Sequence, residues 1–142
     1  MSPEPSGRLG LNMPQFMYIF RGGAFVTPGL SPTEMQAHLE KWYAWAGALA
    51  KQGRSSGGHP LDNGGKTIRG QDRVVTDGPY AESKDLVTGS LVLEAASLEE
   101  ATELALGCPV FEMGGSLEVR PVSKAEVEAE AHANERPAGG AL

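Results

Sequence analysis

The chain has 142 residues, of which 18 are acidic and 12 are basic, so its formal net charge is −6. This length suits one domain, and the acidic balance argues against a nucleic-acid partner, which needs a basic face. No apolar run approaches the roughly 20 residues of a membrane span, and residues 1–12 lack the apolar segment of a secretory signal. We therefore expect a cytoplasmic protein with no membrane partner. One cysteine, Cys108, excludes an intrachain disulfide and a cysteine-built zinc site.

Both ends of the chain are of low complexity. Residues 1–12 are rich in Pro, Gly and Ser and are predicted to form a disordered extension. Residues 124–142 are rich in Ala and Glu and then in Pro and Gly, which predicts a flexible tail. The folded domain is therefore expected to span residues 13–123.

The first predicted elements are a strand and a long helix. Residues 15–21 form a nearly continuous apolar run, which is typical of a central strand buried on both faces. Ser31 and Glu34 form a capping box with Pro32 at the first helical position, so we predict a helix over residues 32–52. Its apolar face repeats at spacings of four and three residues: Met35, Leu39, Trp42, Ala46 and Leu49.

The second half of the chain contains mainly short elements. A short strand is expected near Leu61, and residues 66–69 and 73–76 flank a turn and predict a β-hairpin. Residues 88–94 predict another strand. Ser97 and Glu100 form a second capping box before a short helix that ends at Gly107. The polar–apolar alternation of residues 116–120 predicts a half-exposed strand.

The order of these elements is β-α-β, an inserted hairpin, and then β-α-β. This order predicts an α+β, ferredoxin-like split βαβ fold, with an antiparallel sheet and both helices on one face. No helix is left to cover the other face of the sheet. We therefore predict an isologous homodimer in which two such sheets pack face to face.

The segment from Asp77 to Lys84, with the sequence DGPYAESK, is the most distinctive of the chain. It resembles the DGPF signature of the YCII-related domain family, with Tyr80 in place of Phe. The surrounding order is also similar to that of the family: RVVT before the segment, Cys108-Pro109, and EVRP ending at Pro121. The resemblance implies the dimeric α/β-barrel variant of the fold. It implies no activity, because most members have none assigned, and genes of this branch often neighbour sigma factors, which suggests a regulatory context.

Asp77 is the first candidate site residue, with two interpretations. Its carboxylate can accept N–H bonds from the turn that it opens, which is a structural role. Alternatively it points into a cleft as a proton acceptor, beside Tyr80 as an aromatic wall with a hydroxyl. Glu82 and Lys84 lie on the short exposed stretch that follows and are candidate ligand-binding residues.

His38 is the second candidate catalytic residue. With Leu39 it resembles the His-Leu pair on the first helix of some YCII relatives, where a His–Asp pair has been suggested as catalytic. A histidine facing a cleft can titrate near neutral pH and move a proton. The alternative is a solvated or packing histidine. The nearby aromatic cluster of Trp42, Tyr43 and Trp45 predicts core and dimer packing, or ligand stacking by a ring that faces away from the sheet.

Two functions remain open on the sequence alone. The first is an enzyme or binder for a small polar or aromatic metabolite, in a cleft beside the Asp77 turn. Asp77 would be its base, His38 a second acid–base group, and Arg69 or Arg120 an anion clamp. The second is a non-catalytic dimeric interaction module linked to sigma-factor signalling. No motif requires a cofactor or a metal.

Overall fold

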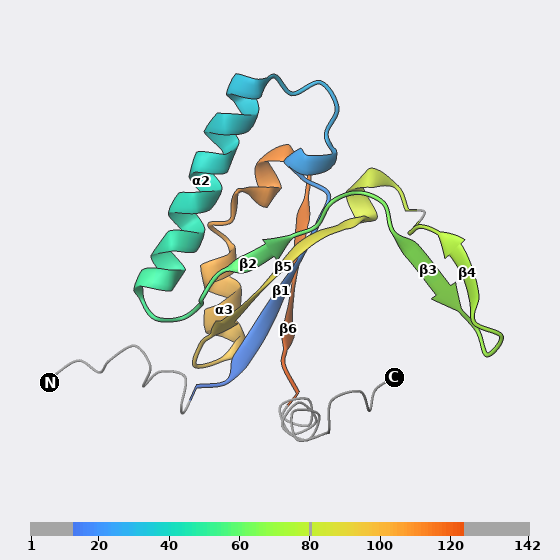
Figure 1. Cartoon of the computed structure of the whole chain (residues 1–142). Helices are drawn as coiled ribbons and strands as arrows, with labels where there is room; N and C mark the ends of the chain where they lie inside the picture. Colours follow the sequence, from blue (N-terminus) through green and yellow to red (C-terminus); the bar gives the residue numbers. More distant parts are fainter. Residues whose placement is uncertain (1–12, 80, 124–142) are drawn as a thin grey trace, which may run out of the picture.

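The computed structural model of the chain describes residues 13–79 and 81–123. Both predicted termini, 1–12 and 124–142, lie outside the described residues. Four strands form one antiparallel sheet in the order β2-β5-β1-β6, and two more form a separate hairpin (Figure 1). This is the predicted ferredoxin-like split βαβ fold. The elements are β1 (Gln15–Arg21), η1 (Ala24–Val26), α2 (Pro32–Lys51), β2 (Gly58–Pro60), β3 (Lys66–Arg69), β4 (Val74–Asp77), η2 (Ser83–Asp85), β5 (Val87–Glu94), α3 (Leu98–Ala105), η3 (Pro109–Met113) and β6 (Ser116–Pro121).

β1 lies in the middle of the sheet, between β5 and β6. Its side chains alternate between buried and half-buried along the whole strand. The prediction of a strand buried on both faces is therefore wrong for the single chain. The reason is that both helices cover the same face, so Met17 and Ile19 point to an uncovered one.

Of the two predicted capping boxes, the one at the start of α2 is complete and the one at the start of α3 is half formed. At the start of α2, Ser31 Oγ accepts from Glu34 N at 3.1 Å, while Glu34 Oε1 accepts from Ser31 N at 2.8 Å. At the start of α3, Ser97 accepts from Glu100 N, but the Glu100 carboxylate accepts from Ala96 N instead of completing the box. Among the described residues, no helix is long and apolar enough to cross a membrane.

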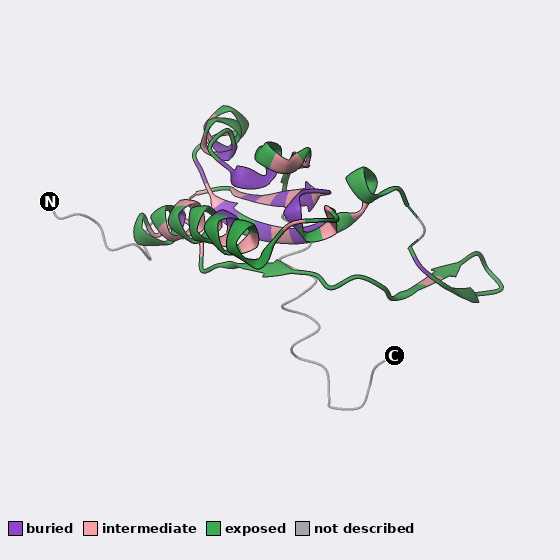
Figure 2. Ribbon diagram, turned by 90° about the horizontal axis from the view of Figure 1, so that it is seen from above, coloured by how far each residue is buried: buried purple, intermediate pink, exposed green. Residues whose placement is uncertain are grey.

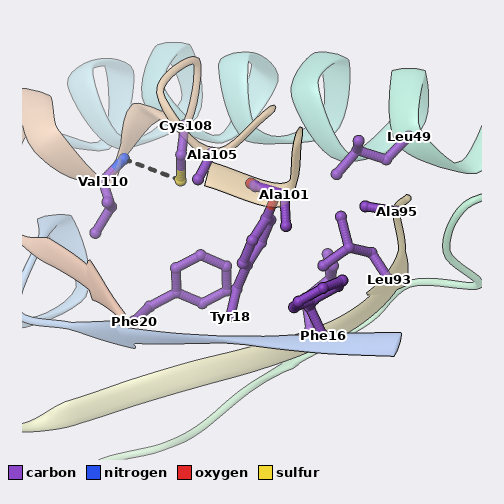
Figure 3. Close-up of a cluster of buried hydrophobic side chains, with 11 residues drawn as sticks. Phe16, Tyr18, Phe20, Leu49, Leu93, Ala95, Ala101, Ala105, Cys108 and Val110 are labelled. Atoms are coloured by element: carbon purple, nitrogen blue, oxygen red, sulfur yellow. Dashed lines mark hydrogen bonds between the residues drawn. The ribbon is translucent and has the colours of Figure 1, made fainter. Parts of the chain in front are cut away.

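The hydrophobic core lies between β1, β5 and the two helices. Figure 3 shows Phe16, Tyr18 and Phe20 projecting from β1 toward the helices. Tyr18 donates its hydroxyl proton to the carbonyl of Ala101 on α3, and its ring stacks on Trp45 of α2 with centroids 5.9 Å apart. Burial raises the pKa of the Tyr18 hydroxyl to about 12. One side chain thus joins the sheet to both helices.

The hairpin of β3 and β4, residues 66–77, projects from the rest of the domain, and we call it the hairpin arm (Figure 1). Every residue of the arm is exposed except Thr67, which is half-buried (Figure 2). Its register pairs Lys66 with Asp77 and Ile68 with Val75. Residues that alternate along paired strands share a face, so these two pairs lie on the same side of the arm.

Candidate functional site

A cavity of about 430 Å³ lies between α2 and the part of the sheet where β2 meets β5. Among the described residues that line it, none carries a formal charge, and four are aromatic. They come from six elements and the loops beside them: Phe20, Gly22, Gly23, Ala24, Phe25, Leu39, Trp42, Tyr43, Ala46, Gly58, His59, Pro60, Thr88, Gly89, Ser90, Leu91 and Val110.

The aromatic wall of the cavity is built by β1 and α2 together. Phe20 lies at the end of β1 and meets the Trp42 ring edge-on, with centroids 5.0 Å apart and planes at 86°. After Phe20 the chain turns sharply through Gly22 and Gly23, whose φ angles are 69° and 90°. Only glycine adopts such angles without strain. A side chain at Gly23 would also meet Val110 at 3.2 Å, so the turn keeps this end of the cavity open.

Three residues with polar side chains border the cavity along β5 and β2. Thr88 is buried and donates its hydroxyl proton to the carbonyls of Phe20 and Gly22, at 3.3 and 3.0 Å. The half-buried Ser90 and the exposed His59 lie opposite each other in the register of β5 and β2. Ser90 also lies opposite Ile19 of β1, so the side chains of Ser90 and His59 belong to the uncovered face of the sheet and these two residues border the cavity through their backbone.

His38 lies on α2 but does not line the cavity. Its side chain is 2% exposed, and its Nε2 accepts a hydrogen bond of 2.9 Å from Nε1 of Trp42, one helical turn further on. Burial lowers the pKa of His38 from its usual range, against an opposing effect of Glu112. The structure thus places His38 behind the aromatic wall instead of in a cleft with Asp77.

Asp77 lies at the end of the hairpin arm, where its side chain is exposed. Its Oδ1 is 2.6 Å from Nζ of Lys66 on the opposite strand. Tyr80, the aromatic residue of the same motif, lies outside the described residues. Glu82 and Lys84 are exposed at and beside η2, with 3.9 Å between their charged atoms. The ion pairs of Asp77, Glu82 and Lys84 therefore join exposed side chains.

The two arginines proposed as anion clamps lie on different parts of the molecule. Arg69 is on the hairpin arm opposite Val74. Arg120 is on β6, where its Nη1 lies 3.2 Å from Oε2 of Glu118, and Arg21 of β1 bonds the other oxygen at 2.6 Å. The Arg21 bond holds the pKa of Glu118 below its usual range. This charged cluster lies on the uncovered face of the sheet.

None of the predicted site residues that the structure describes lines the cavity. The sequence analysis did not predict that residues of β1, α2 and β5 would together enclose a cavity. The available signal was the Trp42-Tyr43 pair, for which ligand stacking was one of two interpretations. The residues left without a place in the cavity are Asp77, His38, Glu82, Lys84, Arg69 and Arg120.

The described residues include one cysteine, Cys108. It is buried, and burial raises the pKa of its thiol to about 12. Figure 3 shows its sulfur accepting a hydrogen bond from the Val110 amide. Within residues 13–79 and 81–123, no three His, Cys, Asp or Glu side chains are close enough to hold a metal ion.

The family model described as YCII-related domain matches residues 20–126 of the chain. The chain matches no curated protein. Among solved structures it is similar to 5-chloro-2-hydroxyhydroquinone dehydrochlorinase from Burkholderia phenoliruptrix, in complex with 2,5-dihydroxybenzoquinone. The identity is 17% and the TM-score 0.41, over 77% of this chain and 93% of that one.

Proposed function

The chain belongs to the YCII-related domain family, and we propose that it binds a small, uncharged aromatic molecule in the cavity between α2 and the sheet. The observation that carries this proposal is the composition of the lining, which combines four aromatic rings with no charged side chain. The volume of about 430 Å³ falls in the usual range of roughly 300–1,000 Å³ for ligand pockets.

The charge of the ligand follows from the same lining. A carboxylate or phosphate enters an apolar space only at a large desolvation cost unless a cation pairs with it. The arginines proposed as clamps lie elsewhere, so the lining favours a neutral ring. The Tyr43 hydroxyl suits one hydroxyl or carbonyl group on that ring.

A matched pair of substitutions on α2 tests the binding site. Ala46 lines the cavity, whereas Ala48 lies two residues further on and is exposed. We expect Ala46→Leu to fill part of the cavity and weaken binding of phenol or catechol at least tenfold, while Ala48→Leu leaves it unchanged. Isothermal titration calorimetry measures both. Equal affinity in the two variants, or no binding of either probe to the wild-type chain, would overturn the proposal.

Charge selectivity is tested with a second pair of ligands. Benzamide and benzoate have the same size and shape and differ in charge at neutral pH. We expect benzamide to bind more tightly, because benzoate would bring an unpaired charge into the apolar lining. Tighter binding of benzoate would place the site beside one of the arginines instead.

We also propose that the protein is a homodimer that pairs the uncovered faces of two sheets. Met17, Ile19 and Val92 form an apolar strip on that face, and the Arg21–Glu118–Arg120 cluster lies beside it. A two-fold axis through this face would pair the strip with its own copy. Sedimentation equilibrium should give twice the chain mass, and Val92→Glu should give the chain mass. A wild-type monomer at micromolar concentration would overturn this part.

A further inference from the structure

Most of the buried side of α2 is apolar, but one of its two fully buried residues is a histidine. His38 and Leu49 are these two residues, and the His38 side chain is 2% exposed. His38 lies four residues before Trp42, so both project from the same face of the helix. A titratable ring therefore sits in direct contact with the aromatic wall of the cavity.

The hydrogen bond between these two rings fixes the protonation state of His38. An indole Nε1 can only donate, and here it donates to His38 Nε2 at 2.9 Å. His38 Nε2 must therefore carry a lone pair. The imidazole is neutral and holds its single proton on Nδ1. A second proton would set two N–H groups against each other and abolish the bond.

The other nitrogen of His38 is buried and has no hydrogen-bond partner among the described residues. The nearest acceptor is Oε1 of Glu112 on η3, at 3.9 Å, which is too long for a hydrogen bond. Lys41 Nζ holds that same oxygen at 3.1 Å. Glu112 and Lys41 are thus the charged groups that face His38, one from η3 and one from α2 itself. Burial lowers the pKa of His38, Glu112 raises it, and Lys41 lowers it again.

Trp42 connects this pair to the cavity. Its ring lines the cavity, meets Phe20 at 5.0 Å and 86°, and meets Trp45 at 5.8 Å and 83°. The bond to His38 is the polar contact of this indole, and its N–H would be left unsatisfied in a half-buried place without it. Such an orphaned donor is costly, so the ring would turn toward water or another acceptor. A turn of Trp42 changes the shape of the cavity wall.

We propose that His38 is a positioning residue of the cavity: neutral His38 holds Trp42 in place as its wall, and protonation of His38 releases that ring and weakens ligand binding. This inference rests on the proposed function. It also replaces an acid–base role of His38 with a role through Trp42. The direction follows from linkage: a ligand that needs neutral His38 loses affinity as pH falls through the pKa of the folded state.

The pKa of His38 also sets the pH window for stability. Because the folded pKa lies below the unfolded value of about 6.5, the unfolded chain binds more protons between these two values. The stability that neutral His38 contributes is therefore fully present above about pH 6.5 and is lost as the pH falls through the folded pKa. Ligand affinity should fall as the pH drops below the folded pKa, while the protein is still folded.

The first experiment follows Trp42 without any ligand. The chain has two tryptophans, so Trp45→Phe leaves Trp42 as the single indole. We expect its fluorescence to change between about pH 7 and pH 4.5 with a midpoint below about 6.5, while far-ultraviolet circular dichroism stays constant. In the same background, His38→Gln should keep the neutral-pH emission and remove the transition, because its side-chain oxygen accepts the indole proton but does not titrate.

Two further variants separate positioning from a general loss of packing. Glu112→Gln removes the charge that raises the pKa of His38, so the midpoint should move to lower pH. His59→Gln removes the other histidine of the described residues, which lies on β2, and should leave the midpoint unchanged. If His38 had only a structural role, the midpoint of the fluorescence transition would not change in Glu112→Gln. A transition that persists in His38→Gln, or that follows His59, would overturn the inference.

The second experiment measures phenol affinity across the same pH range, because phenol stays uncharged there. We expect its dissociation constant to rise up to tenfold per pH unit below the midpoint in the wild-type chain and to stay constant in His38→Gln. A constant affinity in both proteins would overturn the inference while leaving the proposed function intact. If phenol and catechol do not bind at all but the fluorescence transition is present, the proposed function fails. The inference that neutral His38 positions Trp42 is then still supported.

Discussion

The four-stranded sheet with its two helices, which we call the domain body, and the hairpin arm contain the same kinds of contact. The two regions differ in how far these contacts are buried. In the body, Leu93 of β5 is 0% exposed, and in the arm, Ile68 of β3 is 64% exposed. The body has the ion pair Arg54–Glu100, with side chains 16% and 37% exposed, and the arm has Lys66–Asp77, at 66% and 70%. Burial, more than the identity of the partners, therefore decides what each contact contributes.

The same difference bears on function. The cavity lies in the body, where a Trp–His pair and the end of β1 hold its wall in one geometry. The most distinctive motif of the sequence begins in the arm, whose strands contact chiefly each other. An isolated two-stranded hairpin is marginally stable in water. If the arm has a docking partner, what the arm contributes to function should therefore depend on that partner. Ligand binding by the domain body should not.

The largest effect is expected in the body. Leu93→Ala should lower the free energy of unfolding by about 2–5 kcal/mol, because it removes buried methyl groups and leaves a cavity in a packed core. Urea unfolding followed by circular dichroism measures this change. A loss below about 1 kcal/mol would mean that the core around β5 relaxes to fill the space.

The ion pair of the body should come next. Arg54 bonds the carbonyl of Glu94 at 3.0 Å and the Glu100 carboxylate at 3.2 Å, so it joins the segment after α2 to β5 and α3. Arg54→Met should cost about 1–3 kcal/mol of unfolding free energy, since it removes charged hydrogen bonds from a largely buried group. The matched change in the arm, Lys66→Met, should cost less than about 1 kcal/mol. Equal losses in the two variants would contradict the role of burial.

The apolar pair of the arm gives a smaller effect still. Ile68→Ala should change the unfolding free energy by no more than about 0.5 kcal/mol, because the side chain is largely in water already. Thermal unfolding at two protein concentrations checks this. A larger loss that grows with protein concentration would show that another copy of the chain covers Ile68 and Val75.

The sequence predicted the fold far better than the site, for a physical reason. The capping box of Ser31 and the apolar run of residues 15–21 are local signals, and they give nearly the observed limits of α2 and β1. The cavity instead joins residues distant in sequence, such as Phe20, Trp42 and His59, and only packing brings them together. The sequence does indicate that His38 lies on the apolar face of the helix, because it is four residues before Trp42.

The smallest effect is expected at Asp77, and it decides what the motif contributes. Asp77→Asn removes the charge but keeps an oxygen near Lys66, and an exposed ion pair contributes about 0–1 kcal/mol. We therefore expect an unfolding free energy within about 0.5 kcal/mol of the wild-type value and an unchanged affinity for phenol. Calorimetric titration and urea unfolding of the same preparation measure both.

A different result at Asp77 would be equally informative. Asp77 does not line the cavity of its own chain in the described arrangement, so a tenfold loss of phenol affinity at constant stability would require the arm to reach a cavity in another arrangement. If the arm of one copy brings Asp77 to the cavity of another copy, the loss should disappear in the monomeric Val92→Glu variant. If Asp77→Asn weakens binding equally in the monomer, Asp77 reaches its own cavity by a movement of the arm. The two variants together therefore distinguish an arm that contacts the cavity of its own chain from one that contacts the cavity of another copy.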